Sequence, residues 1–145
     1  MMNVDKGLID ARLRYEKLYG NESCEEYAID KIEESLKIKL PDDFKLISKF
    51  YSGGSLGGIS HYDISSSGDS VLTETLRLRE SIGLLHKYVV IAEPASGLIV
   101  LNVDNNNVIW CDSTDAENLN TDSCNNPDVW NSYAAFFVSL LDEEI

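Results

Sequence analysis

Three short apolar runs between residues 88 and 112 constrain the fold more than any other feature of the chain. The runs are YVVIA at 88–92, GLIVLNV at 97–103 and NVIWCD at 107–112. They are rich in the β-branched residues that strands favour. The segments between them, EPAS and DNNN, have the composition of turns, and Asn and Asp tolerate the left-handed backbone that tight turns need. The sequence therefore predicts an antiparallel meander, with a hairpin between the second and third strands.

The part of the chain before these strands has apolar residues at helical spacing. A first amphipathic helix is predicted over 5–19. The segment SCEE at 23–26 has the form of a capping box led by Ser23, so it predicts the start of a second helix. A third helix is predicted to begin at Pro41 and to end at the glycine pair 53–54.

The remaining segments complete the order of elements. Residues 58–64, GISHYDI, have strand character. Either Ser70 or Asp69 can cap the next helix, which is predicted to run to Ile82. The polar and acidic stretch 113–126 is predicted to form a long surface loop. Residues 127–141 are predicted to form a closing helix whose aromatic face, including Trp130, packs on the sheet.

Helices, then an antiparallel sheet, then a final helix predict a single α+β domain over residues 1–145. A chain of this length buries about two thirds of its unfolded surface, so its core needs neither metal nor disulfide. The cysteines, at 24, 111 and 124, include no CxxC pair and indicate neither a disulfide framework nor a zinc site. The composition, with 43% hydrophobic and 26% charged residues, excludes intrinsic disorder.

Charge is unevenly distributed along the chain. There are 25 acidic and 12 basic residues, so the net charge is −13, and binding of nucleic acid through a basic face is not expected. The last cationic residue is Lys87, whereas residues 88–145 hold ten acids. Such a polarised chain attracts cationic partners and speeds their encounter. The alternative is a solvated acidic surface that only keeps the protein soluble.

No segment is apolar over the roughly 20 residues that a membrane span needs, and the N-terminal residues are charged. We therefore expect a cytoplasmic protein without a membrane partner.

Sites for chemistry are weakly supported. His61 and Asp63 have the two-residue spacing that puts side chains on one face of a strand, where they could orient an imidazole or bind a metal. No nucleophile or second set of ligands accompanies them. The glycine-rich segment 52–58 follows a predicted helix and lacks a phosphate-binding pattern, so capping and a flexible turn explain it. We expect no enzymatic activity, no metal and no cofactor.

A protein-binding face is a better prediction. Trp110 lies beside Asp112 in the third β-run, and aromatic residues flanked by acids are typical of protein interfaces, although Trp110 could equally belong to the core. The predicted partner-binding residues are Asp104, Trp110, Asp112, Asp115, Glu117 and Asp122.

The order and spacing of three segments resemble the SUKH superfamily. Residues 30–55, DKIEESLKIKLPDDFKLISKFYSGGS, resemble its opening motif, in which an acidic helix ends at Leu-Pro and a second helix ends at a glycine pair. Residues 88–113 are similar to its β-meander, and 130–144 to its closing aromatic helix. The resemblance covers most of 23–144. One departure is that Asn102 follows Leu101 where the family commonly has Leu-Asp.

The resemblance implies a twisted antiparallel sheet wrapped by N-terminal helices and a C-terminal helix, without catalytic residues. Bacterial members are similar to immunity proteins that bind and neutralise polymorphic toxins, often nucleases or deaminases. Fungal members look like regulators of cell-wall synthesis and signalling scaffolds. We therefore expect an immunity protein, or antitoxin, that binds a cationic nuclease-type toxin domain through its acidic half. The alternative is a non-enzymatic regulatory scaffold.

Overall fold

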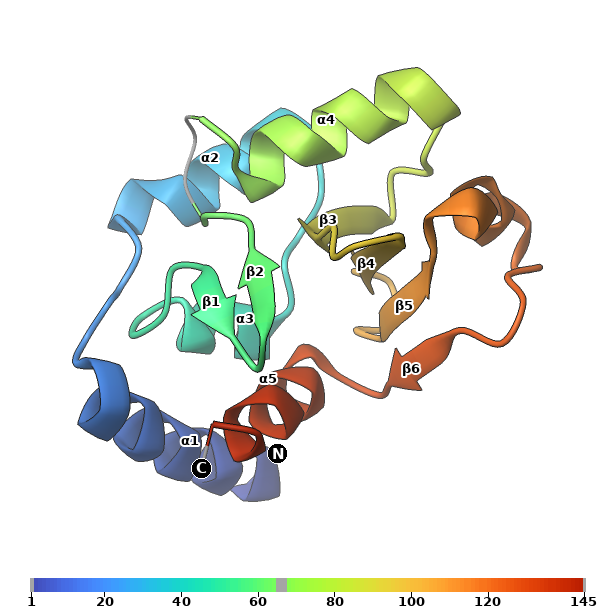
Figure 1. The fold of residues 1–145 in the computed structure, drawn as a ribbon. Helices are drawn as coiled ribbons and strands as arrows, with labels where there is room; N and C mark the ends of the chain where they lie inside the picture. Colours follow the sequence, from blue (N-terminus) through green and yellow to red (C-terminus); the bar gives the residue numbers. More distant parts are fainter. Residues whose placement is uncertain (1, 65–67, 145) are drawn as a thin grey trace.

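The computed structural model describes residues 2–64 and 68–144, and its centre is an antiparallel sheet of six strands in the order β1-β2-β3-β4-β5-β6 (Figure 1). Every neighbouring pair is antiparallel, which confirms the predicted meander and the α+β class. The strands are β1 (Gly54–Leu56), β2 (Ile59–His61), β3 (Tyr88–Ala92), β4 (Gly97–Asn102), β5 (Val108–Asp112) and β6 (Asp128–Trp130).

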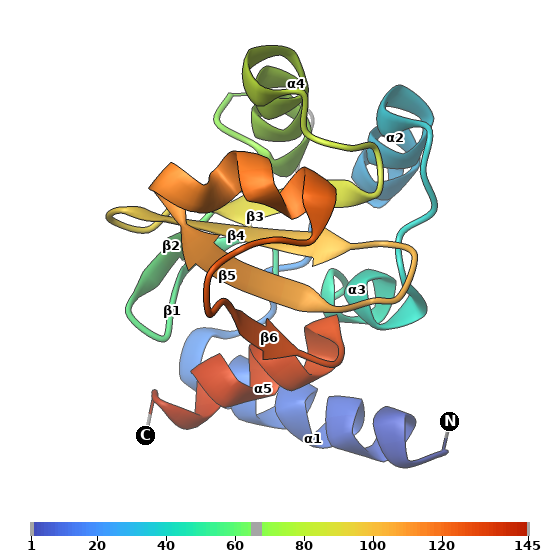
Figure 2. The same cartoon turned by 90° about the vertical axis from the view of Figure 1, so that its right-hand side faces the viewer.

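Helices cover both faces of this sheet (Figure 2). The helices are α1 (Met2–Tyr19), α2 (Glu26–Leu36), α3 (Asp42–Ile47), α4 (Val71–Ile82), the 3₁₀ helix η1 (Ser113–Thr121) and α5 (Tyr133–Asp142). Helices α1, α3 and α5 lie on one side, called here the α5 face. Helices α4 and η1 lie on the other, the η1 face, with α2 beside α4.

The central strands alternate between two hydrophobic cores. Val89 and Ile99 belong to the core of the α5 face, and their neighbours Val90 and Leu98 to the core of the η1 face. All residues of β3 and β4 are buried, because a sheet that is covered on both faces needs apolar residues throughout these strands.

The buried carboxylate of Asp43 joins three segments on the α5 face. It accepts hydrogen bonds from the backbone N–H of Ala134, at 2.8 Å, and from Nδ2 of Asn106, at 3.1 and 3.2 Å. It thereby connects α3 to the β4–β5 turn and to the first turn of α5. A buried carboxylate requires such donors, because burial without them is costly.

The predicted capping box at Ser23 is wrong. Helix α2 begins after Glu25, which makes no side-chain capping bond, and Cys24 is held instead by a hydrogen bond from its N–H to the carbonyl of Ser48. The Ser23 N–H itself donates to the side chain of Asn21. The tertiary hydrogen bond between Cys24 and Ser48, and not a local cap, therefore fixes the chain at the start of the helix.

Helix α3 is shorter than predicted. Pro41 is its N-cap and not its first helical residue, and the helix ends at Ile47. Overlapping turns follow at residues 48–51, with hydrogen bonds from the N–H groups of Lys49 and Phe50 to the carbonyls of Leu46 and Ile47, so the glycine pair is not a helix end. Gly54 begins β1, and the glycine-rich segment forms the β1–β2 hairpin.

Two further predictions are wrong between residues 113 and 132. The expected surface loop 113–126 contains η1, because Ala116 and Leu119 are buried against the η1 face. The closing helix begins at Tyr133 and not at 127, since Asp128–Trp130 pair with β5 and Ser132 caps α5.

Candidate functional site

The six residues predicted to bind a partner lie on β5, on the turn before it and on the segment after it. Asp104 lies in the β4–β5 turn, whereas Asp112 is the last residue of β5. These two carboxylates are therefore at opposite ends of the strand. Asp115 and Glu117 belong to η1, and Asp122 is its C-cap. The fold thus joins Asp112 to the η1 carboxylates and separates Asp104 from them.

Trp110 lies in a row of side chains that crosses the sheet on the α5 face. Its neighbours in register are Ile99 on β4 and Asp128 on β6, and residues directly opposite each other point to the same face. Ile99 is fully buried, Trp110 is half-buried and Asp128 is exposed. A Cβ atom on Gly97 would lie 2.7 Å from Nε1 of Trp110, so the indole fits closely over this glycine. Trp110 therefore packs on the core and also reaches the surface.

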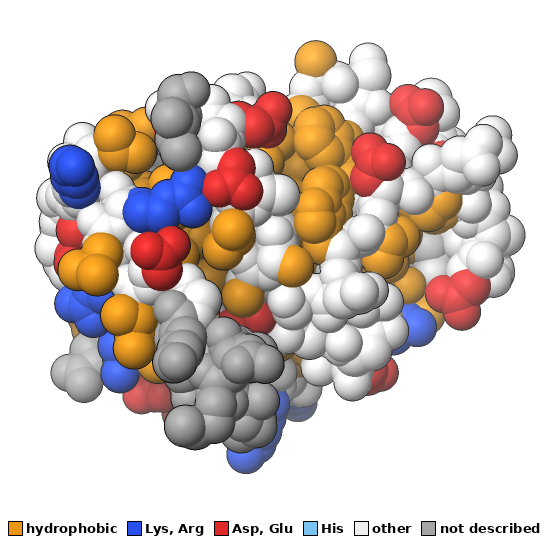
Figure 3. Space-filling model, turned by 90° about the horizontal axis from the view of Figure 1, so that it is seen from below, with side chains coloured by type: hydrophobic (Ala, Val, Ile, Leu, Met, Phe, Trp, Pro, Cys, Tyr) orange, Lys and Arg blue, Asp and Glu red, His pale blue; other side chains and the backbone are white. Residues whose placement is uncertain are grey.

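Acidic side chains border the indole on two sides. Asp112 is two residues after Trp110 on the same strand, so it projects to the same face, and it is exposed. Asp128 lies directly across from Trp110. Seen from the side of α1 and α5, hydrophobic side chains lie in the middle of this face with acidic ones at their borders, and most Lys and Arg side chains gather toward α1 (Figure 3).

The acidic segment that follows β5 is held firmly on the η1 face. The hydroxyl of Tyr88 donates to the carbonyl of Leu119 at 3.0 Å. Asn120 accepts from the N–H of Leu85 at 3.0 Å and donates to the carbonyl of Gly83 at 3.1 Å. These contacts fix the backbone before any partner binds, which lowers the entropy cost of association.

The three carboxylates of this segment have different surroundings. Asp115 accepts hydrogen bonds from the backbone N–H of Asn125 and from the side chain of Asn118, and these bonds lower its pKa. It is an ionised group that holds the segment in shape. Glu117 and Asp122 are exposed. Neither side chain takes part in an ion pair within residues 2–64 and 68–144.

Asp104 has cationic neighbours. It lines a shallow hollow of about 360 Å³ together with Lys37, Lys39, His86 and Lys87. The potential around this carboxylate is therefore set by lysines and differs from that around η1. Sequence reasoning missed this cluster because its members come from separate segments of the chain.

The fold also offsets part of the acidic half. Arg77 pairs with Glu93, which accepts a further hydrogen bond from Tyr62 at 2.8 Å. Arg14 pairs with Asp142 at 2.7 Å. Cations from residues 1–87 thus pair with two of the ten C-terminal acids. Five of the other eight lie on β5, η1 and its C-cap, and β6, whereas Asp104 lies in the β4–β5 turn and Glu143 and Glu144 follow α5.

His61 is enclosed in the core of the α5 face. Its side chain is 8% exposed and lies edge-on or tilted against the rings of Tyr51 and Phe136, with centroids 6.0 and 5.9 Å away. Burial lowers its pKa to about 4, so the imidazole is neutral at pH 7. Asp63, its predicted companion, instead joins β2 to α4 through a bridge to Ser70.

The described part of the chain contains no cluster of three or more His, Cys, Asp or Glu side chains placed to hold a metal ion. Its three cysteines are free thiols. None of its helices is long and apolar enough to cross a membrane.

Comparison with protein families matches residues 6–137 to the family model SUKH_5, described as SMI1-KNR4 cell-wall. The match covers α1 from residue 6, every element from α2 to β6, the first half of α5 and all six predicted partner-binding residues. No curated protein matches the chain.

Proposed function

The chain belongs to the SMI1-KNR4 (SUKH_5) family of the SUKH superfamily, and from this membership we propose that it is an immunity protein. It binds a cognate toxin domain and neutralises it by occupying its active surface. We further propose that the toxin domain is basic and of the nuclease type. A nuclease needs a positive groove to hold phosphates, and an acidic protein competes for that groove.

The observation that supports this proposal is the setting of Trp110. Asp112 and Asp128 border the half-buried indole on the α5 face, and η1 follows Asp112 directly with further carboxylates on a fixed backbone on the opposite face of the sheet. Interface hot spots are enriched in Trp, and the rim around the buried centre of an interface is polar. In this arrangement Trp110 contributes most of the affinity, and Asp112, Glu117 and Asp122 mainly raise the association rate.

The first experiment tests the acidic surface with a charge-matched control. The combined variant Asp112→Asn, Glu117→Gln and Asp122→Asn removes three negative charges from this surface. The control removes three from the exposed faces of the N-terminal helices and α4, with the variants Asp10→Asn, Glu34→Gln and Glu80→Gln.

Both proteins are tested for growth rescue and for association with the toxin domain encoded by the neighbouring gene. The surface variant is expected to associate about tenfold more slowly at low salt and to lose most of the salt dependence of the rate. The control should stay close to wild type. Equal effects of the two variants would show that only net charge matters and would refute the assignment of the site.

Trp110 is tested separately. The variant Trp110→Ala is expected to weaken toxin binding by about 2 kcal/mol or more. Because the indole also packs on the core, thermal unfolding of the variant is measured alongside. Trp110 is an anchor only if the measured loss of affinity is larger than the loss that the unfolded fraction of the variant would cause at the assay temperature.

A second candidate function is a regulatory scaffold, which the cell-wall description of the matched family favours. The two functions differ in genetic context. An immunity gene lies beside a toxin gene and rescues growth when that toxin is expressed, whereas a scaffold gene does neither.

A further inference from the structure

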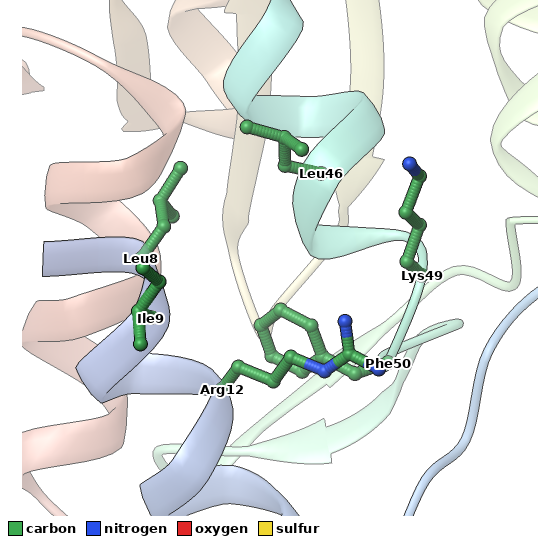
Figure 4. A pocket seen from close by; sticks show the side chains of 6 residues that line it. All are labelled: Leu8, Ile9, Arg12, Leu46, Lys49 and Phe50. Carbon is green, nitrogen blue, oxygen red and sulfur yellow. The ribbon is translucent and has the colours of Figure 1, made fainter. Parts of the chain in front are cut away.

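A groove between α1 and α3 exposes hydrophobic side chains (Figure 4). These helices lie on the side of the sheet opposite η1 (Figure 2). Its volume is about 310 Å³, and its apolar lining consists of Leu8, Ile9, Leu46 and Phe50. Leu8 and Phe50 are buried and form its base, whereas Ile9 is 62% exposed and Leu46 39% exposed. The base is therefore fixed by the core, and the two exposed side chains stand at the surface.

The exposed apolar surface continues along α1. Leu13 lies one helical turn after Ile9 and is 64% exposed. Single exposed leucines are ordinary on protein surfaces, but neighbouring ones beside a groove are typical of an interaction site. Within the described residues, no other element covers these side chains.

The rim of the groove is cationic. Arg12 lies over the ring of Phe50, with its guanidinium carbon 5.9 Å from the ring centre, and Lys49 stands on the α3 side. Arg12 also pairs with Glu16, whereas Lys49 is exposed and takes part in none of the ion pairs of the described residues. Although the net charge of the chain is −13, the cationic side chains of this rim attract anionic groups.

A second hollow lies next to the groove and shares Lys49 with it. Its volume is about 500 Å³, and Cys24, Ile29 and Lys45 contribute to its lining. The two hollows therefore lie on either side of Lys49, one lined by α1 and the other by residues at the start of α2 and before it. Two neighbouring hollows of this size can each hold a side chain of one peptide segment.

We propose that this groove binds an acidic amphipathic segment of a protein partner. The aliphatic side chains of the segment contact Ile9, Leu46 and Phe50, and its carboxylates face Arg12 and Lys49. This inference goes beyond the proposed function, since it concerns a different surface and a partner segment of opposite charge. We choose an acidic occupant because of charge complementarity. The rim of the groove is cationic, whereas the acidic surface elsewhere on the protein repels such a segment.

The test uses two synthetic helical peptides that share a stripe of leucines. One carries Glu at the flanking positions and the other carries Lys. Affinity is measured by fluorescence anisotropy, and the site is located by NMR from the methyl shifts of Ile9 and Leu46. The Glu peptide is expected to bind and to shift both methyl groups, whereas the Lys peptide should leave them unchanged.

Variants then link binding to the groove. Ile9→Asp and Lys49→Glu are each expected to weaken binding of the Glu peptide about tenfold or more. Leu76→Asp, at an exposed leucine of α4 outside the groove, is the matched control and should have no effect. All three positions are exposed, so these variants keep the core intact.

Three results would overturn the inference. The first is that the Glu peptide does not bind, and the second is that Ile9→Asp leaves its affinity unchanged. The third is a dimer in sedimentation that Ile9→Asp dissociates, which would make a second copy the occupant. None of these results bears on toxin protection, so the inference and the proposed function fail separately.

Discussion

Protonation of His61 should destabilise the fold in mild acid. The imidazole lies between Tyr51 and Phe136, and burial lowers its pKa from 6.5 to about 4. The unfolded chain binds a proton near pH 6.5, but the native protein binds it only near pH 4. Between these values the unfolded state holds more protons, so the free energy of unfolding falls as the pH falls.

The size of this effect follows from the difference between the two pKa values. One pKa unit corresponds to about 1.4 kcal/mol, so the change from 6.5 to about 4 amounts to about 3 kcal/mol. The contribution is complete above pH 6.5 and is lost as the pH approaches 4. A domain of this size has a total stability of about 5–15 kcal/mol, so the loss should lower the melting temperature by about 10 °C.

The assay is urea unfolding, followed by circular dichroism, between pH 7 and pH 4. Carboxylates also titrate in this range, so the informative quantity is the difference between proteins. Between pH 7 and pH 4, the variants His61→Phe and His61→Leu should lose about 3 kcal/mol less of their free energy of unfolding than wild type does. This difference holds whatever the substitutions cost in packing at pH 7. His86→Gln, at the other histidine, which is exposed, is the matched control and should keep the wild-type slope.

The reasoning is refuted if the His61 variants and wild type lose stability in parallel between pH 7 and pH 4. An NMR titration of the His61 ring protons provides a direct check. A midpoint near 6.5 in the native protein would mean that the ring is solvated and that its burial has no electrostatic consequence.

Three further substitutions test how the fold holds its surfaces. Asp43→Ala leaves the N–H of Ala134 without its acceptor and should cost about 3 kcal/mol in urea unfolding. Asp115→Asn weakens the bond from Asn125, so amide hydrogen exchange should accelerate in η1 and remain unchanged in β3 and β4. Gly53→Ala should cost about 2 kcal/mol or more in thermal unfolding, because φ is +106° and the new Cβ would lie 2.6 Å from a carbonyl oxygen. A melting curve like that of wild type would contradict this close approach.

The sequence predicted the parts of the fold that depend on neighbouring residues. The three strands at 88–112 were predicted within one residue of their ends, because apolar runs and turn residues act locally. Helix α4 was also predicted, with Ser70 as one of two candidate caps besides Asp69, since the capping bond to the Thr73 N–H spans only three residues. The acidic character of the C-terminal half followed from counting charges.

Other features depended on contacts between distant segments. Asp128–Trp130 form a strand because they pair with the open edge of β5. Taken alone, the local sequence before α5 predicts a helix. Burial of Leu119 against the sheet likewise turned a polar stretch into η1. The sequence also grouped Asp104 with the η1 acids, although the fold puts lysines beside it.

The amino-acid sequence by itself thus determined the family, the fold class and the sign of the charge. The tertiary structure alone decided which carboxylates share a surface with Trp110 and which are neutralised by cations from residues 1–87. The physical reason is that strand pairing and burial join residues that are far apart in the chain, whereas periodicity and capping report only on residues within a few positions of each other.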